Sequence, residues 1–443
     1  MEYTCLGCGD ACGLIMTENE FREFLWAGHG RAAAYARTHD VGAFREVILD
    51  ACLNCRAVDP QCEGTRAGYM LEFVTHLPDA AFYTDAVLDS LPQGGDDWDA
   101  VQRFHFTTYM AMEGDERAKR LVYENYRPGP RHGEWTGVNF VRLDGLPGFL
   151  FAAEKMGELL LSAAQDADEG SLMFQAEETL GKEPALNALR EAALTNPRVD
   201  AYRAMIEARI EARNHLAPSV RTDGFSYQDF LDVVPQLNRS RPARWGELTS
   251  PENLAAAARG LLAAQSPDAQ LLHSRIFQRR AFPLDLSCLF AWAQSSDEKL
   301  AWAATLALDN VTHPSVRQYA FELQESRHSR RDQSIAMLSS NFEAGDHSIA
   351  LRWFETEADR EIRHRLGMDL RKLWERHPQP ETELSMFRTL YERQTCHECR
   401  EYALTDLQKL GAFTPELRAE CLFDSNAEIR QMAGEADAAS PLN

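Results

Sequence analysis

The stretch Pro283–Leu323, PLDLSCLFAWAQSSDEKLAWAATLALDNVTHPSVRQYAFEL, decides the fold class of this chain. Its middle part opens with the N-cap candidates Ser295 and Ser296 and then carries apolar residues at steps of three and four: Leu300, Ala303, Ala304 and Ala307. The pattern stops at Asp309–Asn310. Pro314 restarts it at a first helical position, where the missing N–H group is not needed. The stretch therefore predicts three short helices joined by tight turns, which is the unit of a helical repeat.

The composition extends this prediction to the whole chain. Hydrophobic residues make up 44% and charged residues 26% of the 443 residues, as in folded proteins. Ala, Leu, Glu and Arg are abundant, and all four favour helix. A chain of this length can form two or three domains or one continuous solenoid. We expect an all-α protein, an α-α superhelix of antiparallel helix pairs.

The charge of the chain bears on its partners. The formal net charge is −22 and the isoelectric point is near 5.1, so the mean field repels nucleic acids and anionic lipid surfaces. Two local clusters are basic although the chain as a whole is negatively charged: Arg239, Arg241 and Arg244 with Trp245, and His328 with Arg330 and Arg331. Short arginine clusters are usually solvated helix ends or loops. We therefore expect a protein or peptide partner, a basic one, rather than nucleic acid.

The amino terminus and the hydropathy pattern indicate a compartment. The opening MEYTCLGCGDACG lacks the basic region and apolar core of a secretory signal. No apolar run approaches the roughly 20 residues that a membrane span needs. We expect a cytoplasmic protein without a membrane segment. Its ten cysteines are then thiols or metal ligands rather than a disulfide framework.

Breaks in the helical pattern predict three regions. Residues 1–165 form a region of helical pairs, residues 166–245 a helical linker with an irregular connector, and residues 246–443 a block of repeats. The connector is rich in Pro, Arg, Ser and Asn, and it contains one short helix candidate around Phe230.

The last block contains a recurring helix opening. Acidic or polar residues are followed by an apolar residue or Cys and usually by Arg, in DEKLA from Asp297, DREIR from Asp359, HECRE from His397 and AEIRQ from Ala427. The looser DQSIA from Asp332 adds a fifth member. The starts of these openings lie about 28 to 38 residues apart. Such a spacing is typical of solenoid repeats built from two helices.

These openings resemble the HEAT-repeat superfamily, in particular its short-period subgroup related to phycobilin-lyase repeats. In that subgroup an acidic residue and an arginine open the second helix of each pair. The resemblance covers residues 251–433 most clearly and the amino-terminal half only weakly. It implies a helical-repeat scaffold, and also two enzymatic alternatives: DNA glycosylases of the alkylation-repair type and lyases acting on bilins.

One cysteine motif has metal-ligand character. Cys5 and Cys8 stand in a Cys-x-x-Cys-Gly turn, and Cys52 and Cys55 supply a second Cys-x-x-Cys pair. Together they make a predicted Cys₄ zinc site. The alternative is that Cys52 and Cys55 are small buried hydrophobes on an apolar helix face.

Two further groups of residues are candidates for chemistry. Cys396 and Cys399 look like a redox or metal pair, but their place at a helix opening of the repeat accounts for them structurally. Four histidines are spread over the amino-terminal helices: His29, His39, His76 and His105. An isolated histidine is usually a packing residue. No phosphate-binding loop, nucleophile elbow or dinucleotide fingerprint is present.

The sequence thus favours a non-enzymatic helical-repeat scaffold or adaptor, which binds a protein or peptide on the concave surface of the stack. The alternatives are the HEAT-like enzymes named above and a zinc-stabilised interaction module.

Overall fold

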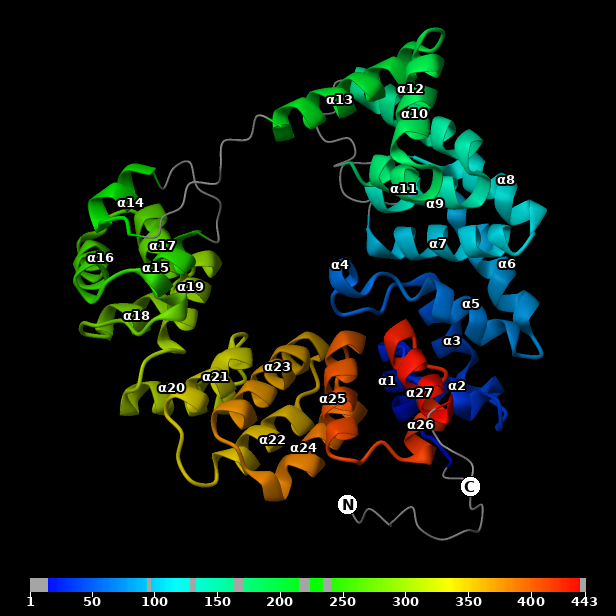
Figure 1. Cartoon of the computed structure of the whole chain (residues 1–443). Coiled ribbons are helices and arrows are strands. Elements are labelled where there is room, and N and C mark those ends of the chain that lie inside the picture. The colour runs from blue at the N-terminus through cyan, green and yellow to red at the C-terminus, as the bar shows by residue number, and fades with distance from the viewer. Residues whose placement is uncertain are drawn as a thin grey trace. The chain divides into compact units, whose positions relative to one another are not determined.

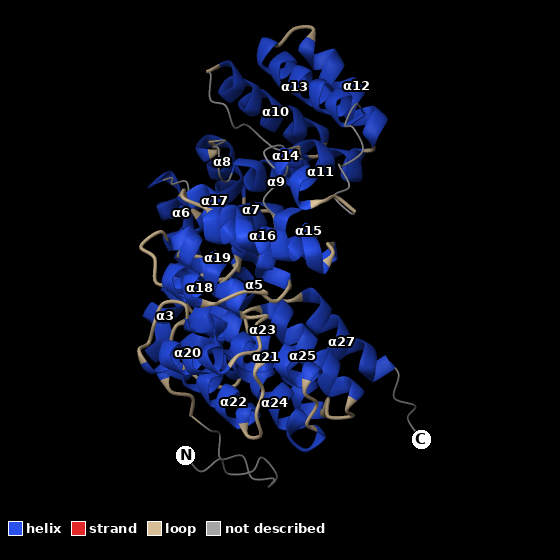
Figure 2. Ribbon diagram, turned by 90° about the vertical axis from the view of Figure 1, so that its left-hand side faces the viewer, coloured by secondary structure: helices blue, strands red, loops and turns tan. Residues whose placement is uncertain are grey.

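The computed structural model of the chain describes residues 15–93, 97–127, 133–162, 170–214, 224–233 and 241–438. Within these ranges the protein consists of 27 α-helices and a few 3₁₀ turns, and no strand occurs there (Figures 1 and 2). The predicted all-α class is therefore confirmed. Among the described helices, none has the length and apolar character needed to cross a membrane.

By its internal contacts the chain divides into two compact units, Met1–Arg209 with Thr414–Asn443, and Ile210–Phe413. The helices of the first unit are α1 (Glu18–Ala27), α2 (Gly30–Ala36), α3 (Arg45–Leu53), α4 (Pro60–Glu63), α5 (Ala67–Thr75), α6 (Ala80–Ser90), α7 (Trp98–Met112), α8 (Glu116–Asn125), α9 (Gly133–Asp144), α10 (Leu146–Leu161), α11 (Ser171–Leu180), α12 (Lys182–Ala193), α26 (Pro415–Cys421) and α27 (Ala427–Ala438). Helix α13 (Pro197–Asn214) runs across the division.

The second unit holds α14 (Tyr227–Val233), α15 (Arg241–Leu248), α16 (Pro251–Ala263), α17 (Pro267–Ile276), α18 (Ser287–Ala293), α19 (Glu298–Leu308), α20 (Pro314–Glu325), α21 (Ser334–Ser340), α22 (Asp346–Thr356), α23 (Arg360–Arg376), α24 (Pro380–Arg393) and α25 (His397–Lys409). Consecutive helices pack on one another, for example α18 on α19, α22 on α23 and α24 on α25. The three-region division predicted from the sequence, 1–165, 166–245 and 246–443, stays a prediction.

The stretch that predicted the fold forms α18, α19 and α20, so its three helices are confirmed. The N-cap of α19 is Asp297 rather than Ser295 or Ser296, because the Asp297 carboxylate accepts hydrogen bonds from the backbone N–H groups of Lys299 and Leu300. Pro314 stands at the start of α20 as expected. The alanines of α19 are buried, and their small side chains let neighbouring helices approach closely.

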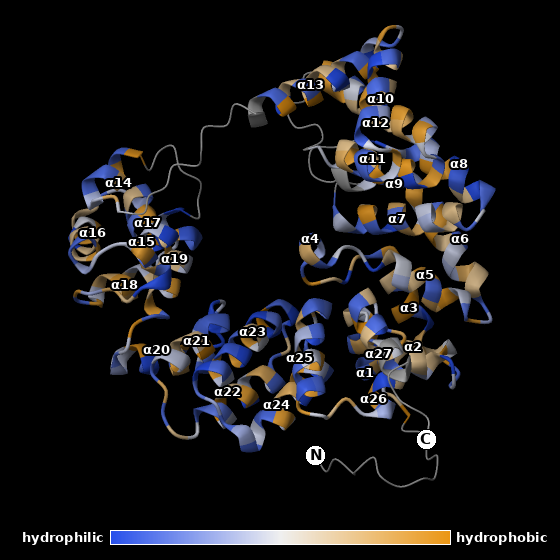
Figure 3. Cartoon of the chain, viewed as in Figure 1, coloured by the Kyte–Doolittle hydropathy of each residue, from blue (hydrophilic) through white to orange (hydrophobic). Residues whose placement is uncertain are grey.

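Apolar side chains of many helices meet inside each unit. Hydrophobic and hydrophilic segments are interspersed along the helices, as expected of amphipathic helices (Figure 3). The core of the first unit includes Phe21, Ile48, Met70 and Phe106, and a core of the second includes Trp245, Leu261, Phe277 and Leu338. Each unit therefore contains its own buried apolar cluster.

The helix opening seen in the sequence has a structural counterpart. Arg363 in α23, Arg400 in α25 and Arg430 in α27 each donate from Nη1 to the backbone carbonyl six residues earlier, at 3.3, 3.4 and 2.5 Å. Arg363 and Arg400 are buried. Burying an arginine is tolerated when its guanidinium finds carbonyl partners. The recurrent arginine thus fastens the turn that precedes each of these helices.

Helices α26 and α27 belong to the first unit, where α26 packs on α2. The Ser425 backbone N–H donates to the carbonyl of Gly28 at 2.8 Å, and Arg31 forms an ion pair with Glu420 at 2.8 Å. A Cβ atom at Gly30 would lie 1.9 Å from the Glu420 carbonyl oxygen. Glycine is required there because the two backbones touch.

Candidate metal centre

Of the four cysteines predicted to bind zinc, two fall inside the described residues. Cys5 and Cys8 lie outside them. Cys52 is fully buried in α3 within the core of the first unit, and burial raises the pKa of its thiol. Cys55 follows α3; its backbone N–H donates to Asp99 at 2.7 Å, and burial raises its thiol pKa too. A raised pKa disfavours the thiolate form that metals bind. The set of four stays a prediction.

The four amino-terminal histidines have separate local contacts. His29 is the N-cap of α2, and its Nδ1 accepts from the Arg31 backbone N–H. His39 stacks on Tyr35, and His105 shares a hydrogen bond with Thr65 at 3.0 Å. None of these histidines joins a metal-competent group among the described residues.

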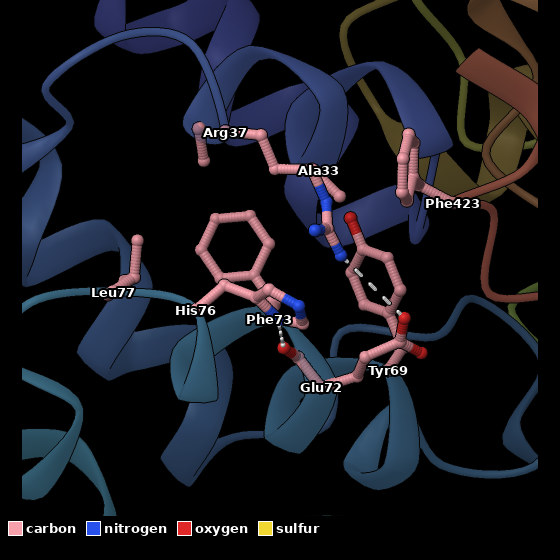
Figure 4. Close-up of a pocket in the computed structure, with 9 residues that line it drawn as sticks. Ala33, Arg37, Tyr69, Glu72, Phe73, His76, Leu77 and Phe423 are labelled. Carbon is pink, nitrogen blue, oxygen red and sulfur yellow. Dashed lines mark hydrogen bonds and ion pairs between the residues drawn. The ribbon is translucent and has the colours of Figure 1, made fainter. Parts of the chain in front are cut away.

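His76 lines a small hollow in the first unit (Figure 4). Phe73, Tyr69 and Phe423 supply apolar walls, and Arg37 lies 4.0 Å from the Glu72 carboxylate and over the Phe423 ring. The hollow has a volume of about 10 Å³, which is room for one water molecule. A space of this size does not accommodate an organic substrate.

The described residues contain one group with metal-ligand geometry, in the second unit. His364 of α23, the α25 N-cap residue Cys396 and Cys399 of α25 place one ligand atom each within 4.8 Å of one another. The His364 Nε2 atom lies 3.4 Å from the Cys399 Sγ atom. Cys396 is buried, and His364 and Cys399 are half-buried. The spacing of the two cysteines is visible in the sequence, whereas nothing there singles out His364.

Helix geometry brings the two cysteines together. Cys396 is the N-cap of α25, and Cys399 stands three residues later, at the N3 position. In a capping box these two positions exchange hydrogen bonds, so their side chains meet. Helix α1 of this chain shows that arrangement, with the Thr17 hydroxyl 2.7 Å from the Glu20 carboxylate. In α25 two sulfur atoms take the place of those oxygens.

The cysteines depart from the pattern of the other openings. The N-cap is Asp297 in α19 and Asp359 in α23, and each caps its helix through its carboxylate. Cys396 makes no side-chain capping hydrogen bond. Its place at the helix opening is confirmed, but capping does not explain why a thiol stands there.

Two neighbours hold His364 against the cysteines. Gln394, which is buried just before α25, donates from Nε2 to the His364 carbonyl at 3.2 Å. A Cβ at Gly367 would lie 2.3 Å from that Gln394 nitrogen, so only glycine leaves room for the contact. The Thr395 hydroxyl also donates to the Arg360 carbonyl at 3.2 Å. These bonds tie the start of α25 to the first turns of α23.

The chemistry of this group suits zinc. Thiolate sulfur and imidazole nitrogen are the ligands of tetrahedral Zn²⁺ sites, and bond lengths of about 2.3 and 2.05 Å imply a sulfur–nitrogen separation of about 3.6 Å. The observed 3.4 Å is close to that value. The His364–Cys399 separation therefore matches two corners of a zinc tetrahedron, and the Cys396 ligand atom lies within 4.8 Å of both.

The second unit also holds a group of buried carboxylates. The Oδ1 atom of Asp309 is buried and accepts no hydrogen bond from the described residues. Burial, and then the nearby charges of Asp369 and Asp332, raise the pKa of Asp309 well above its usual range. Lys372 pairs with Asp369 at 2.9 Å, and Arg365 pairs with Asp332 at 3.0 Å. Asp309 is thus the member of this group without an ion-pair partner among the described residues.

The proposals for this chain rest on its own sequence and structure. No protein-family model, no curated protein and no solved structure matches this chain.

Proposed function

We propose that this chain is a zinc-stabilised helical-repeat module that binds a protein or peptide partner. The observation that carries the proposal is the convergence of His364, Cys396 and Cys399 within 4.8 Å. These residues come from α23 and α25, the second helices of two successive pairs. A zinc ion held there joins one pair to the next, and its binding free energy adds to the stability of the array.

The HEAT-like solenoid is part of this proposal. Support comes from the packing of consecutive helices and from the arginine contact that recurs in α23 and α25 at the predicted openings. Solenoid repeats expose long surfaces on which partner segments dock. The net charge of −22 favours a basic partner. No observation favours the glycosylase or lyase alternatives.

Metal analysis tests the zinc site directly. Protein purified without added metal is expected to carry about one zinc ion per chain, measured by inductively coupled plasma mass spectrometry. His364→Ala, Cys396→Ser and Cys399→Ser should each lose most of it. Cys288→Ser is the matched control, because Cys288 is a half-buried thiol of the same unit outside the group. Retention of zinc by all three ligand variants would refute the site.

Cobalt substitution identifies the ligands. A Co²⁺ ion bound by two thiolates gives sulfur-to-metal charge-transfer absorption, which weakens when one thiolate is removed. We expect Cys396→Ser and Cys399→Ser to weaken that absorption and Cys288→Ser to leave it unchanged. The Cys₄ site predicted from the sequence would appear as a second equivalent of zinc. That equivalent would be lost in a Cys5→Ser, Cys8→Ser double variant.

The scaffold function has a separate test. Immobilised protein should retain basic peptides from an arrayed library at low salt and release them as ionic strength rises. Retention only of acidic peptides would contradict the charge argument. The same library applied to immobilised His364→Ala protein shows whether the metal site supports binding.

A further inference from the structure

The two cysteines of the metal centre also have the geometry of a disulfide-forming pair. Residues at positions N-cap and N3 of a helix lie about 5 Å apart between Cα atoms. Disulfides span Cα separations of about 4.4–6.8 Å. The Sγ atoms of Cys396 and Cys399 already lie within 4.8 Å of each other, and no disulfide joins them in the structure. Side-chain rotation alone can therefore close the bond.

The two thiols of this pair differ in their access to solvent. Both thiols stand at the amino-terminal end of α25, three residues apart. Cys399 is half-buried and reachable from solvent, whereas Cys396 is buried. Within the pair, an oxidant thus meets the Cys399 sulfur before the Cys396 sulfur, and Cys396 lies next to it as the resolving thiol.

We propose that Cys396 and Cys399 form a reversible dithiol–disulfide pair, and that their oxidation by a peroxide releases the metal ion. The release depends on the zinc site proposed above, whereas the disulfide itself does not. The oxidant class is a small peroxide such as hydrogen peroxide.

The chemistry balances in two steps. The Cys399 thiolate attacks one peroxide oxygen, the O–O bond breaks, and a sulfenic acid and hydroxide form; the hydroxide takes a proton and becomes water. The Cys396 thiolate then attacks the sulfenic sulfur, the S–S bond forms, and a second hydroxide leaves and is protonated. The two sulfur atoms lose two electrons in total, and hydrogen peroxide is reduced to two water molecules.

Metal loss follows from the ligand count. A disulfide sulfur is a far poorer ligand than a thiolate, because it carries no negative charge. After oxidation only His364 of the three ligands remains. One imidazole does not retain Zn²⁺ against water and buffer, so the ion dissociates. A thiol reductant restores both ligands and allows zinc to bind again.

The sequence provides a convenient readout. Trypsin cleaves after Arg393 and Arg400, so both cysteines fall in the single peptide Gln394–Arg400, QTCHECR. An internal disulfide lowers the mass of this peptide by two hydrogen atoms and prevents its alkylation. Full-length protein is treated with hydrogen peroxide, alkylated, digested and analysed by mass spectrometry. Zinc release is followed in parallel with a chromogenic chelator.

We expect the peptide with the internal disulfide to accumulate as one equivalent of zinc is released, and dithiothreitol to reverse the mass change. In Cys399→Ser protein the internal disulfide cannot form. His364→Ala retains both thiols, so its peptide should still form the disulfide even though zinc is absent. Cys288→Ser should behave as the parent protein.

The outcomes separate the two proposals. If the reduced protein binds zinc but peroxide leaves the Gln394–Arg400 peptide reduced, or converts it only to sulfinic acid, the redox pair is refuted and the zinc site stands. If reduced protein holds no zinc and takes none up, the zinc site fails whether or not the peptide forms its disulfide.

Discussion

Glu63 and Arg66 form a buried ion pair in the first unit, and its removal is the sharpest test of the packing. The side chains are 0% and 2% exposed, and Glu63 Oε2 contacts Arg66 Nη2. Glu63 Oε1 accepts from the backbone N–H groups of Val58 and Asp59, at 3.1 and 3.0 Å. Arg66 Nη1 also donates to Ser425 at 3.1 Å. The pair therefore connects the start of α5 to the residues before α27.

The substitution Glu63→Gln keeps the shape of the side chain and removes its charge. The Arg66 guanidinium then stays buried without its counter-ion, and breaking a buried pair in this way costs about 3–5 kcal/mol. A unit of this size loses about 2–4 °C in Tm per kcal/mol, so we expect its transition to fall by roughly 6–20 °C.

Arg117→Ala is the matched control, because Arg117 is 45% exposed and pairs with Asp85 and Asp89 on the surface. Such pairs contribute at most about 1 kcal/mol. Calorimetry gives the Tm of both variants, and hydrogen exchange shows whether α4, α5 and α27 lose protection while the second unit does not. A Glu63→Gln protein as stable as Arg117→Ala would refute the argument from burial.

Three smaller perturbations probe other contacts. Asp309 has a raised pKa, so the folded protein loses stability as pH rises from the ordinary carboxyl range towards that pKa. Asp309→Asn should remove this loss. Urea unfolding should therefore show the variant more stable relative to the parent protein at pH 8 than at pH 5. Gly30→Ala should cost about 1–3 kcal/mol, since its Cβ meets the Glu420 carbonyl, and limited proteolysis should then cut the carboxy-terminal helices more rapidly. Tyr227→Phe removes the 2.6 Å hydrogen bond to His273 Nε2 and should cost about 1–3 kcal/mol, seen as faster hydrogen exchange in α14.

The fold class was predictable because helix periodicity and capping are local. The triplet α18 to α20 and the openings of α19, α23 and α25 follow from residues close together in sequence. The cap of α19 was displaced by one or two residues from the prediction. Asp297 wins over the preceding serines because its carboxylate reaches two backbone N–H groups.

Helix α15 shows where local signals fail. Its sequence RPARWGEL contains Pro and Gly and was assigned to an irregular connector. Trp245 is buried and stacks on Phe230 at 4.4 Å, and Gly246 lets the Ile276 carbonyl approach where a Cβ would lie 1.9 Å away. Tertiary packing therefore outweighs the poor helix propensity. Trp245, the aromatic residue of the first basic cluster, is therefore a core residue.

One arginine of the second basic cluster is engaged in an ion pair. Arg331 forms a two-pronged ion pair with Glu357, at 2.6 and 2.9 Å, and burial together with the adjacent arginine charges lowers the pKa of His328. A guanidinium engaged in this way is poorly available to a phosphate group. The positive charges are visible in the sequence, whereas the Glu357 carboxylate that pairs with Arg331 stands 26 residues further along the chain.

The metal centre combines both cases. The Cys396–Cys399 spacing was visible, since N-cap and N3 positions meet in any helix that starts there. His364 carries no signal of its own, because it precedes Cys396 by 32 residues and comes near it only once α23 and α25 lie together. That pairing depends on Gln394 and on Gly367, which reads in sequence as a helix-weakening residue. An N-cap and an N3 side chain of one helix can therefore meet a residue of a helix two elements earlier, and spacing rules for single-loop metal motifs overlook such groups.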